Sequence, residues 1–477
     1  MSMRPRKSIC VGLDVHKNNV WACVAFKNPD VKYDELKFVT KKFNSNHTDL
    51  VDMCDWARSV VPKQLVQSPE DLAIHVYMES TGKYSSPVYD VCEEMGMIPH
   101  IVNPKHVRMI EGQKKDQKDC DWIAELGSNG LLRESYIPQR PIREARGLSR
   151  TRTKLVQERG NVFRRIRNIL TEANCRVDLV FSGIEGESAM RVIMYMIETE
   201  EPDFYEVLKL IRKSCKIMKY SSEEERKEKE EELRKAIVGA KFSPQQKFKL
   251  RSAYEKIDQL NKQIRNYEYM MHQTLEPFNN YLDLLDSIPG ISKLAAMQIL
   301  AEIGTDMDHF ENEKQFISWC GLCPQSNESN NKHKTVKIGK GGYYLKPVLI
   351  QCALAAVKSH YFKVKYESIS RRRGKKRALI AIARKLMVIA YHLFQTGEYF
   401  REDYGEEKLE NSWSEENKTS EETEETPISS DARQTAQELA DILADADLDK
   451  LKPKIEQLLI QMGITQAIQK ATKLNAS

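Results

Sequence analysis

The sequence predicts an α/β domain followed by a mainly helical region. Two β-type runs, Ile9 to Val15 and Val20 to Phe26, are separated by polar residues, a pattern typical of a hairpin. A third run ends at Glu79, and a fourth, "IPHIVNP", follows a stretch with helical spacing. Strands that alternate with helices favour a sheet with at least partly parallel pairing. After about Ile137 the apolar spacing becomes helical.

Two long helices are predicted in the middle of the chain. In the first, Leu148, Leu155, Val162 and Ile169 recur every seven residues and predict a core-facing stripe. The second has an a/d heptad pattern, which predicts a coiled coil, a long helical hairpin or a dimer contact. Its heptad positions are Leu250, Ala253, Ile257, Leu260, Ile264, Tyr267 and Met271. Residues 221–237 between these helices are densely charged and predict a solvated helix or a connector.

The remaining segments differ in composition. The stretch "LLDSIPGISKLAAMQILAEIG" predicts a helix-hairpin-helix, whose Pro-Gly turn could offer backbone N–H groups to a phosphate. Residues 401–432 are acidic and poor in apolar side chains, which favours a disordered linker. The expected domains are a catalytic domain over 1–140, a helical and coiled-coil region over 141–279, a C-terminal domain over 280–400, the linker over 401–432, and a helical extension over 433–477.

The net charge of +5 conceals a strong asymmetry along the chain. From Lys332 to Lys385 there are 16 Lys or Arg and one acid, Glu367, whereas residues 401–432 hold 12 acids and three bases. Clustered cations are what a phosphate-contacting surface needs, since each neutralised phosphate releases counterions. The predicted nucleic-acid contacts are Arg150, Arg152, Arg159, Arg164, Arg165, Lys332, Lys334, Lys337, Lys340, Arg371, Arg372, Arg373, Lys375, Lys376 and Arg377.

Composition argues against secretion and against a structural zinc site. No segment approaches 18 uninterrupted apolar residues, and the N-terminus runs directly into a strand pattern, so we expect a cytoplasmic protein with no membrane partner. Ten cysteines are scattered along the chain, and Cys320 and Cys323 form a single CxxC. Without a second pair of ligands, a closed zinc site is not supported, and we expect reduced thiols packed as small apolar residues.

Four carboxylates occupy positions on the predicted strands and helix that could bind divalent metal ions. Asp14 lies within the first predicted strand, Glu79 ends another, and Asp116 and Asp119 share one face of a predicted helix start. Such a set could hold two divalent ions, the arrangement that activates one oxygen and stabilises another in phosphoryl transfer. Each acid alone also fits a purely structural role, as a helix cap or a partner of the helix dipole.

The motifs taken in order resemble the DEDD transposases of the insertion sequence 110 and 1111 family. The matching stretches are "VGLDVHK", "YMESTGKY", "KKDQKDCDWIAEL", "IPGISKLAAMQILAEIG" and "WCGLCPQSNES", and the resemblance covers roughly residues 8–174 and 280–395. It implies an RNase H-like, RuvC-type domain in which Asp14, Glu79, Asp116 and Asp119 bind Mg²⁺, two ions per site. It also implies a separate C-terminal transposase domain with a serine nucleophile.

The family serine follows a "GLxP" element, so Ser329 is the implied nucleophile, with Ser326 as the rival and a structural role for both as the alternative. Tyr343 and Tyr344 could also serve as nucleophiles, although stacking or core packing is favoured. Lys115 and Cys120 replace the usual Thr and Ala, and Asn330 replaces the usual Gly. None of these changes removes a carboxylate or the hydroxyl, so we expect activity to be retained. Asp121 is a further acid that leaves the fourth ligand open.

The resemblance implies a DNA recombinase guided by a structured noncoding RNA that pairs with donor and target DNA. It further implies a homodimer that assembles into a tetramer, with active sites that join the acidic residues of one subunit to the serine of another. Two other hypotheses remain open. One is a metal-dependent RuvC-like nuclease that selects DNA structures and cuts by water attack. The other is a non-catalytic RNA- or DNA-binding regulator with the same fold.

Overall fold

The computed structural model describes residues 7–28, 35–66, 73–104, 107, 119–323 and 341–401, and the backbone alone of 328–329 and 332–333. The chain divides into two units, Met1–Tyr399 and Phe400–Ser477. The predicted linker and the helical extension lie outside the described residues, apart from Arg401.

A mixed five-stranded sheet forms the N-terminal region, in the order β3-β2-β1-β4-β5. The strands are β1 (Ile9–Val15), β2 (Asn19–Lys27), β3 (Leu36–Asn44), β4 (His75–Glu79) and β5 (Ile98–Val102). The first three pair antiparallel, whereas β4 pairs parallel with both β1 and β5. The predicted hairpin and the partly parallel pairing are therefore confirmed. Strand β3 was not predicted, because its burial pattern is mostly half-exposed.

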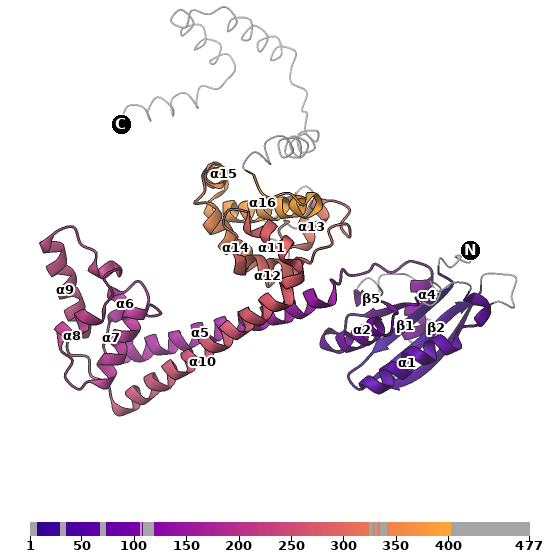
Figure 1. Cartoon of the computed structure of the whole chain (residues 1–477), viewed down its shortest axis with the longest axis horizontal. Coiled ribbons are helices and arrows are strands. Elements are labelled where there is room, and N and C mark those ends of the chain that lie inside the picture. Colours follow the sequence, from indigo (N-terminus) through magenta and orange to yellow (C-terminus); the bar gives the residue numbers. More distant parts are fainter. Residues whose placement is uncertain are drawn as a thin grey trace, which may run out of the picture. The chain divides into compact units, whose positions relative to one another are not determined.

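Helices cover both faces of the sheet (Figure 1). Helices α1 (His47–Val60) and α2 (Ser85–Glu94) share one apolar core with Leu13 and Met78. Helix α4 (Asp119–Ser128) packs on the opposite face, against side chains such as Cys10 and Tyr77. Because side chains alternate along a strand, residues next to Leu13 and Met78 face α4.

The two long helices, α5 (Arg140–Glu172) and α10 (Pro244–Leu275), pack along each other within one chain (Figure 1). The heptad positions of α10 are largely confirmed, since Leu250, Ile257, Leu260, Ile264 and Met271 are buried. The predicted stripe on α5 is only partly correct, because Val162 is buried but Leu148, Leu155 and Ile169 are half-buried. A 3.6-residue helix drifts away from a strict seven-residue repeat over this length. Its buried residues are Ile142, Ala145, Ser149, Val162, Phe163, Ile166 and Leu170.

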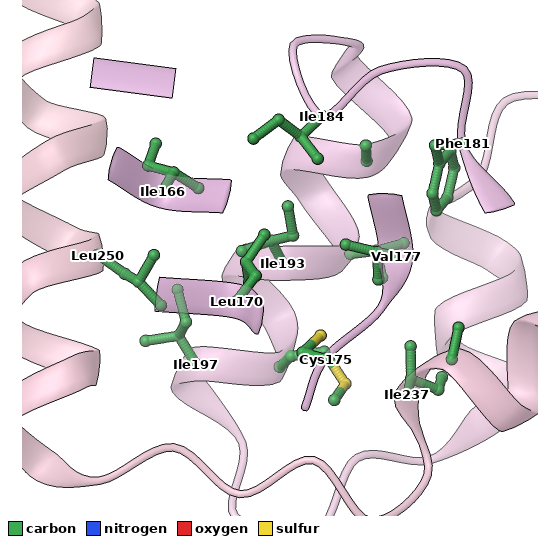
Figure 2. Close-up of a cluster of buried hydrophobic side chains, with 14 of the residues drawn as sticks. Ile166, Leu170, Cys175, Val177, Phe181, Ile184, Ile193, Ile197, Ile237 and Leu250 are labelled. Atoms are coloured by element: carbon green, nitrogen blue, oxygen red, sulfur yellow. The ribbon is translucent and has the colours of Figure 1, made fainter. Parts of the chain in front are cut away.

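A helical insert connects α5 to α10. It contains α6 (Val177–Val180), α7 (Glu187–Glu198), α8 (Phe204–Leu210) and α9 (Glu223–Ile237). Ile193 and Ile197 of α7 pack with Leu170 of α5 and Leu250 of α10 in one apolar cluster, as Figure 2 shows. The densely charged segment is therefore a helix, and its C-terminal turn buries Leu233 and Ile237.

The C-terminal part of the first unit is helical. It contains α11 (Asn279–Asp286), α12 (Lys293–Ile303), α13 (Glu313–Trp319), α14 (Leu345–Ala356), α15 (His360–Arg373) and α16 (Lys375–Thr396), with the short strands β6 (Glu328–Ser329) and β7 (Lys332–His333). Helix α16 is long and apolar enough to cross a membrane, but 56% of its most apolar window is buried within the protein. Its apolar face packs on α11, α13, α14 and α15, which is how the core helix of a globular domain behaves.

Candidate active site

Asp14 and Glu79 occupy neighbouring positions at the ends of two parallel strands. The last register pair between β1 and β4 joins Leu13 to Met78, and each carboxylate residue stands one position further along. Paired residues of parallel strands point to the same face, and Leu13 and Met78 face α1 and α2. Asp14 and Glu79 therefore both project to the face that α4 covers. The sheet register thus brings together two acids that are far apart in the sequence.

Helix α4 approaches β1 closely at Gly12. A Cβ at Gly12 would lie 2.2 Å from the Cys120 carbonyl oxygen and 2.4 Å from the Ala124 nitrogen, so only glycine permits this contact. The contact fixes the first turn of α4, and with it Asp119, on the face of Asp14. Burial raises the pKa of the Cys120 thiol to about 12, with further contributions from Asp121 and, more weakly, from Asp14.

Asp121 faces the antiparallel edge of the sheet. The Asp121 carboxylate accepts a 2.7 Å hydrogen bond from the Thr40 hydroxyl of β3, two strands away from β1. Asp121 therefore contributes to packing between α4 and the antiparallel edge of the sheet. Asp116 lies outside the described residues. Among the residues that are described, no three His, Cys, Asp or Glu side chains already form a group suited to a metal ion.

His16 is a neighbour of Asp14 that sequence reasoning missed. Its Nε2 atom lies 2.9 Å from Asp14 Oδ2, and its side chain is more exposed than that of Asp14. The signal was present in "LDVHK", since residues two apart at a strand end share a face.

A second polar network on the α4 face was also missed. His75 Nδ1 lies 2.8 Å from His100 Nε2, and His100 Nδ1 lies 2.8 Å from Glu134 Oε2. The Tyr77 hydroxyl donates to Glu134 Oε1 at 2.9 Å. The hydrogen bond from His100, followed by that from Tyr77, lowers the pKa of Glu134 to about 2. Burial, followed by the charge of Lys7, lowers the pKa of His75 to about 4. The network ties the segment before α5 to β4 and β5, a long-range pairing that no local pattern reveals.

The backbone at Ser329 forms a short antiparallel pair, in which Ser329 stands opposite Lys332. This hairpin was not predicted from the sequence. Ser326 lies outside the described residues, as do Lys334, Lys337 and Lys340. The predicted Pro-Gly turn joins α11 to α12, and a Cβ at Gly290 would lie 2.4 Å from the Ala356 nitrogen of α14.

Most of the predicted arginine contacts on α5 already have protein partners. Arg150 forms two 2.8 Å hydrogen bonds with the Glu302 carboxylate of α12. Arg152 pairs with Glu268 of α10 at 2.7 Å, and Arg159 Nη1 donates to Asn261 Oδ1 at 2.7 Å. These three guanidinium groups hold α5 to its neighbours. The exposed Arg164 hydrogen-bonds Asn161 of its own helix, and Arg165 is exposed beside it.

The cations between α15 and α16 are arranged differently. Arg371, Arg372 and Arg373 end α15, Lys375, Lys376 and Arg377 begin α16, and all six side chains are exposed. We call these six residues the junction cluster. None of the six is ion-paired within the part of the chain that the structure describes. Lys375, Lys376 and Arg377 stand at a helix N-terminus, where the helix dipole disfavours positive charge, so helix stability does not explain these three. The three arginines stand at a helix C-terminus, where the dipole favours positive charge.

Eight of the ten cysteines are buried and none forms a disulfide, in agreement with the expected packing of reduced thiols.

Two family models match the chain. Residues 11–175 match the DEDD transposase model of the IS110 type, described as a transposase, and residues 282–367 match the Transposase IS116/IS110/IS902 family. The two matches together span more than half of the chain and include the sheet, α5 and the helices that flank Ser329. The protein is a transposase, an enzyme that acts on DNA. It belongs to the IS110 family of DEDD transposases, and this membership implies dependence on a divalent metal ion. A search of curated proteins found no match.

Proposed function

We propose that this transposase cuts and rejoins the DNA of its insertion element through a 5′-phosphoserine intermediate, with Ser329 as nucleophile and an acidic Mg²⁺ site as its activator. One observation supports this best: Asp14 and Glu79 stand at adjacent register positions on the α4 face. The sheet has three antiparallel strands followed by two parallel strands, and this arrangement supports the RNase H-like, RuvC-type fold.

The acids fit a divalent metal in chemistry. Carboxylate oxygens are the hard ligands that Mg²⁺ prefers, and Asp14, Glu79 and Asp119 share one face of the sheet domain. With Asp116 they would hold the metal, which supplies charge stabilisation and a lower pKa for the attacking hydroxyl. Asp119 is the better candidate for the fourth ligand than Asp121, because the Asp121 carboxylate lies against Thr40 of β3, two strands away from β1.

In the serine step one bond to phosphorus forms and one breaks. The Ser329 Oγ forms a bond to phosphorus, the P–O3′ bond breaks, and the 3′-oxygen leaves with the proton that the hydroxyl loses. The phosphoserine ester conserves the bond energy, so attack by a 3′-hydroxyl on phosphorus releases the serine and rejoins DNA. Cations at 332–346 would hold the scissile phosphate. A Pro-Gly turn before α12 would act as a helix-hairpin-helix contact to the DNA backbone.

We further propose that a structured guide RNA selects donor and target DNA, and that dimers assemble into a tetramer whose sites combine acids and serine from different subunits. The charge of the junction cluster supports contact with nucleic-acid phosphates. Sequencing of the RNA that copurifies tests this proposal. An RNA encoded in the flanks of the gene is expected, and the absence of any bound structured RNA would contradict guidance.

The nucleophile is tested with a DNA adduct assay. Protein with its copurified RNA is incubated with Mg²⁺ and a plasmid that carries the gene and its flanks, and denaturing gels detect covalently bound DNA. Ser329→Ala should lose the adduct and Ser326→Ala should keep it. The reverse result would move the nucleophile to Ser326.

Two outcomes would replace the proposal. Cleavage by Ser329→Ala at the wild-type rate, without any adduct, would favour a structure-selective nuclease that uses water. If Asp14→Asn and Glu79→Gln left element movement unchanged while binding persisted, the protein would act as a non-catalytic regulator.

A further inference from the structure

The segment that carries Ser329 leaves the helical core at a glycine. Helix α13 ends in a Schellman arrangement, in which the Leu322 N–H donates to the Ile317 carbonyl at 3.2 Å and the Gly321 N–H donates to the Ser318 carbonyl at 2.9 Å. Gly321 has a φ of +73°, a conformation that glycine adopts without strain. Leu322 is buried directly after it, so this end of the segment is firmly held.

At Gly341 and Gly342 the chain returns to the C-terminal end of α13. A Cβ at Gly321 would lie 2.6 Å from the Gly341 carbonyl oxygen, and a Cβ at Gly342 would lie 2.3 Å from the Cys320 carbonyl oxygen. Gly342 also has a positive φ, +64°. Two backbones therefore touch where residues 322–340 begin and end. We call Gly321, Gly341 and Gly342 the glycine neck. Helix capping accounts for Gly321, but it does not account for the contact of Gly342 with Cys320.

Helix α5 braces the neck. The Arg150 guanidinium lies 4.8 Å from the ring centroid of Tyr344, two residues after Gly342, while it also pairs with Glu302. The Gly342 carbonyl accepts from the Lys346 N–H at 2.9 Å, which connects the neck to the start of α14. Arg150 thereby links α5, α12 and the neck.

We propose that the glycine neck, braced by Arg150, positions Ser329 for attack. This inference rests on the proposed role of Ser329 as nucleophile. The neck fixes where the chain that carries Ser329 leaves the helical domain and where it returns. A displacement of about 1 Å at the reacting atom is enough to reduce a rate about 100-fold. The neck residues are positioning residues, because they act through the segment and not on the DNA.

Gly342→Ala tests the inference against a matched control outside the neck. Gly239→Ala imposes alanine at a similar φ of +84°, but nothing lies within 4 Å of its Cβ. The measurements are the single-turnover rate of adduct formation on the plasmid, the affinity for a random-sequence duplex, the melting temperature, and the rate of tryptic cleavage within residues 332–340.

Gly342→Ala should slow adduct formation at least tenfold and accelerate tryptic cleavage, with affinity for the duplex unchanged. Gly239→Ala should form the adduct at the wild-type rate, although alanine at a positive φ is expected to lower its melting temperature. Equal effects of Gly342→Ala and Gly239→Ala would overturn the inference, because the cause would then be backbone strain alone. An unchanged rate in Gly342→Ala would also overturn it.

Arg150→Lys provides a second test should Gly342→Ala fold poorly. Lysine keeps one positive charge near Glu302, but it loses the planar group that lies over Tyr344. Slower adduct formation with unchanged duplex affinity is expected, whereas a wild-type rate would contradict the brace. Ser329→Ala in the same assay separates the two proposals. If Ser329→Ala still forms the adduct, Ser329 is not the nucleophile, whatever the effect of the neck variants.

Discussion

Two groups of cations that look alike in the sequence have different roles in the structure. Arg150 and Arg152 of α5 pair with acids of α12 and α10, whereas the junction cluster is exposed. Arg146 extends the first group, since it donates to the Ala301 and Glu302 carbonyls at 2.9 Å and burial lowers its pKa. These carbonyls end α12 and have no helical partner, so Arg146 satisfies them. A high local count of arginines therefore does not by itself identify a nucleic-acid surface.

Neutralising the junction cluster should have the largest effect on binding. Each lost phosphate contact reduces the steepness of log affinity against log salt by about 0.9, so the loss of six contacts should reduce it by about 5 and weaken binding at physiological salt. Affinity for a random-sequence duplex, measured over a series of salt concentrations, checks this, and the melting temperature should not fall. The substitutions are Arg371→Gln, Arg372→Gln, Arg373→Gln, Lys375→Gln, Lys376→Gln and Arg377→Gln. An unchanged slope would remove the distinction between the two groups.

Arg146→Met should be the most destabilising change on α5. Methionine keeps the apolar stem but leaves two carbonyl groups of α12 without their donor, at a cost of about 2–3 kcal/mol in the free energy of unfolding. Denaturant unfolding measures this cost. Duplex affinity of the folded variant should stay at the wild-type value, and a selective loss of affinity would instead assign Arg146 to the nucleic-acid surface.

Arg152→Gln should have a smaller effect on stability. The Arg152 side chain is 15% exposed and that of Glu268 is 29% exposed, so solvent screens part of the attraction. A loss of about 1 kcal/mol is expected, with no change in the salt slope. A lower salt slope in this variant would mean that Arg152 exchanges its protein partner for a phosphate.

Arg165→Gln should change stability least. Arg165 is exposed on α5, so its removal should alter the free energy of unfolding by less than about 0.5 kcal/mol. The slope of log affinity against log salt shows whether Arg165 contacts phosphate. If it does, as the junction cluster is proposed to do, the steepness of the slope should decrease by about one. No decrease would leave Arg165 outside the binding surface.

The strands and long helices were predictable because their signals are local. Alternation from Ile9 to Phe26 predicted β1 and β2, and the heptads of α10 predicted its buried face. Strand β3 gave no clear signal, since it lies at the sheet edge with few buried side chains. The partner of α10 was not predictable either, because α5 is separated from it by the helical insert.

The sequence by itself determined the residue types of the candidate site and the strand or helix on which Asp14, Glu79 and Asp119 stand. These follow from periodicity and from the order of motifs, which depend on residues close together in the chain. The tertiary structure decided which cations remain exposed, which strand Asp121 of α4 contacts, and that the two ends of the Ser329 segment meet at three glycines. Such relations depend on contacts between distant segments, and no local pattern encodes the partner that packing brings to a side chain.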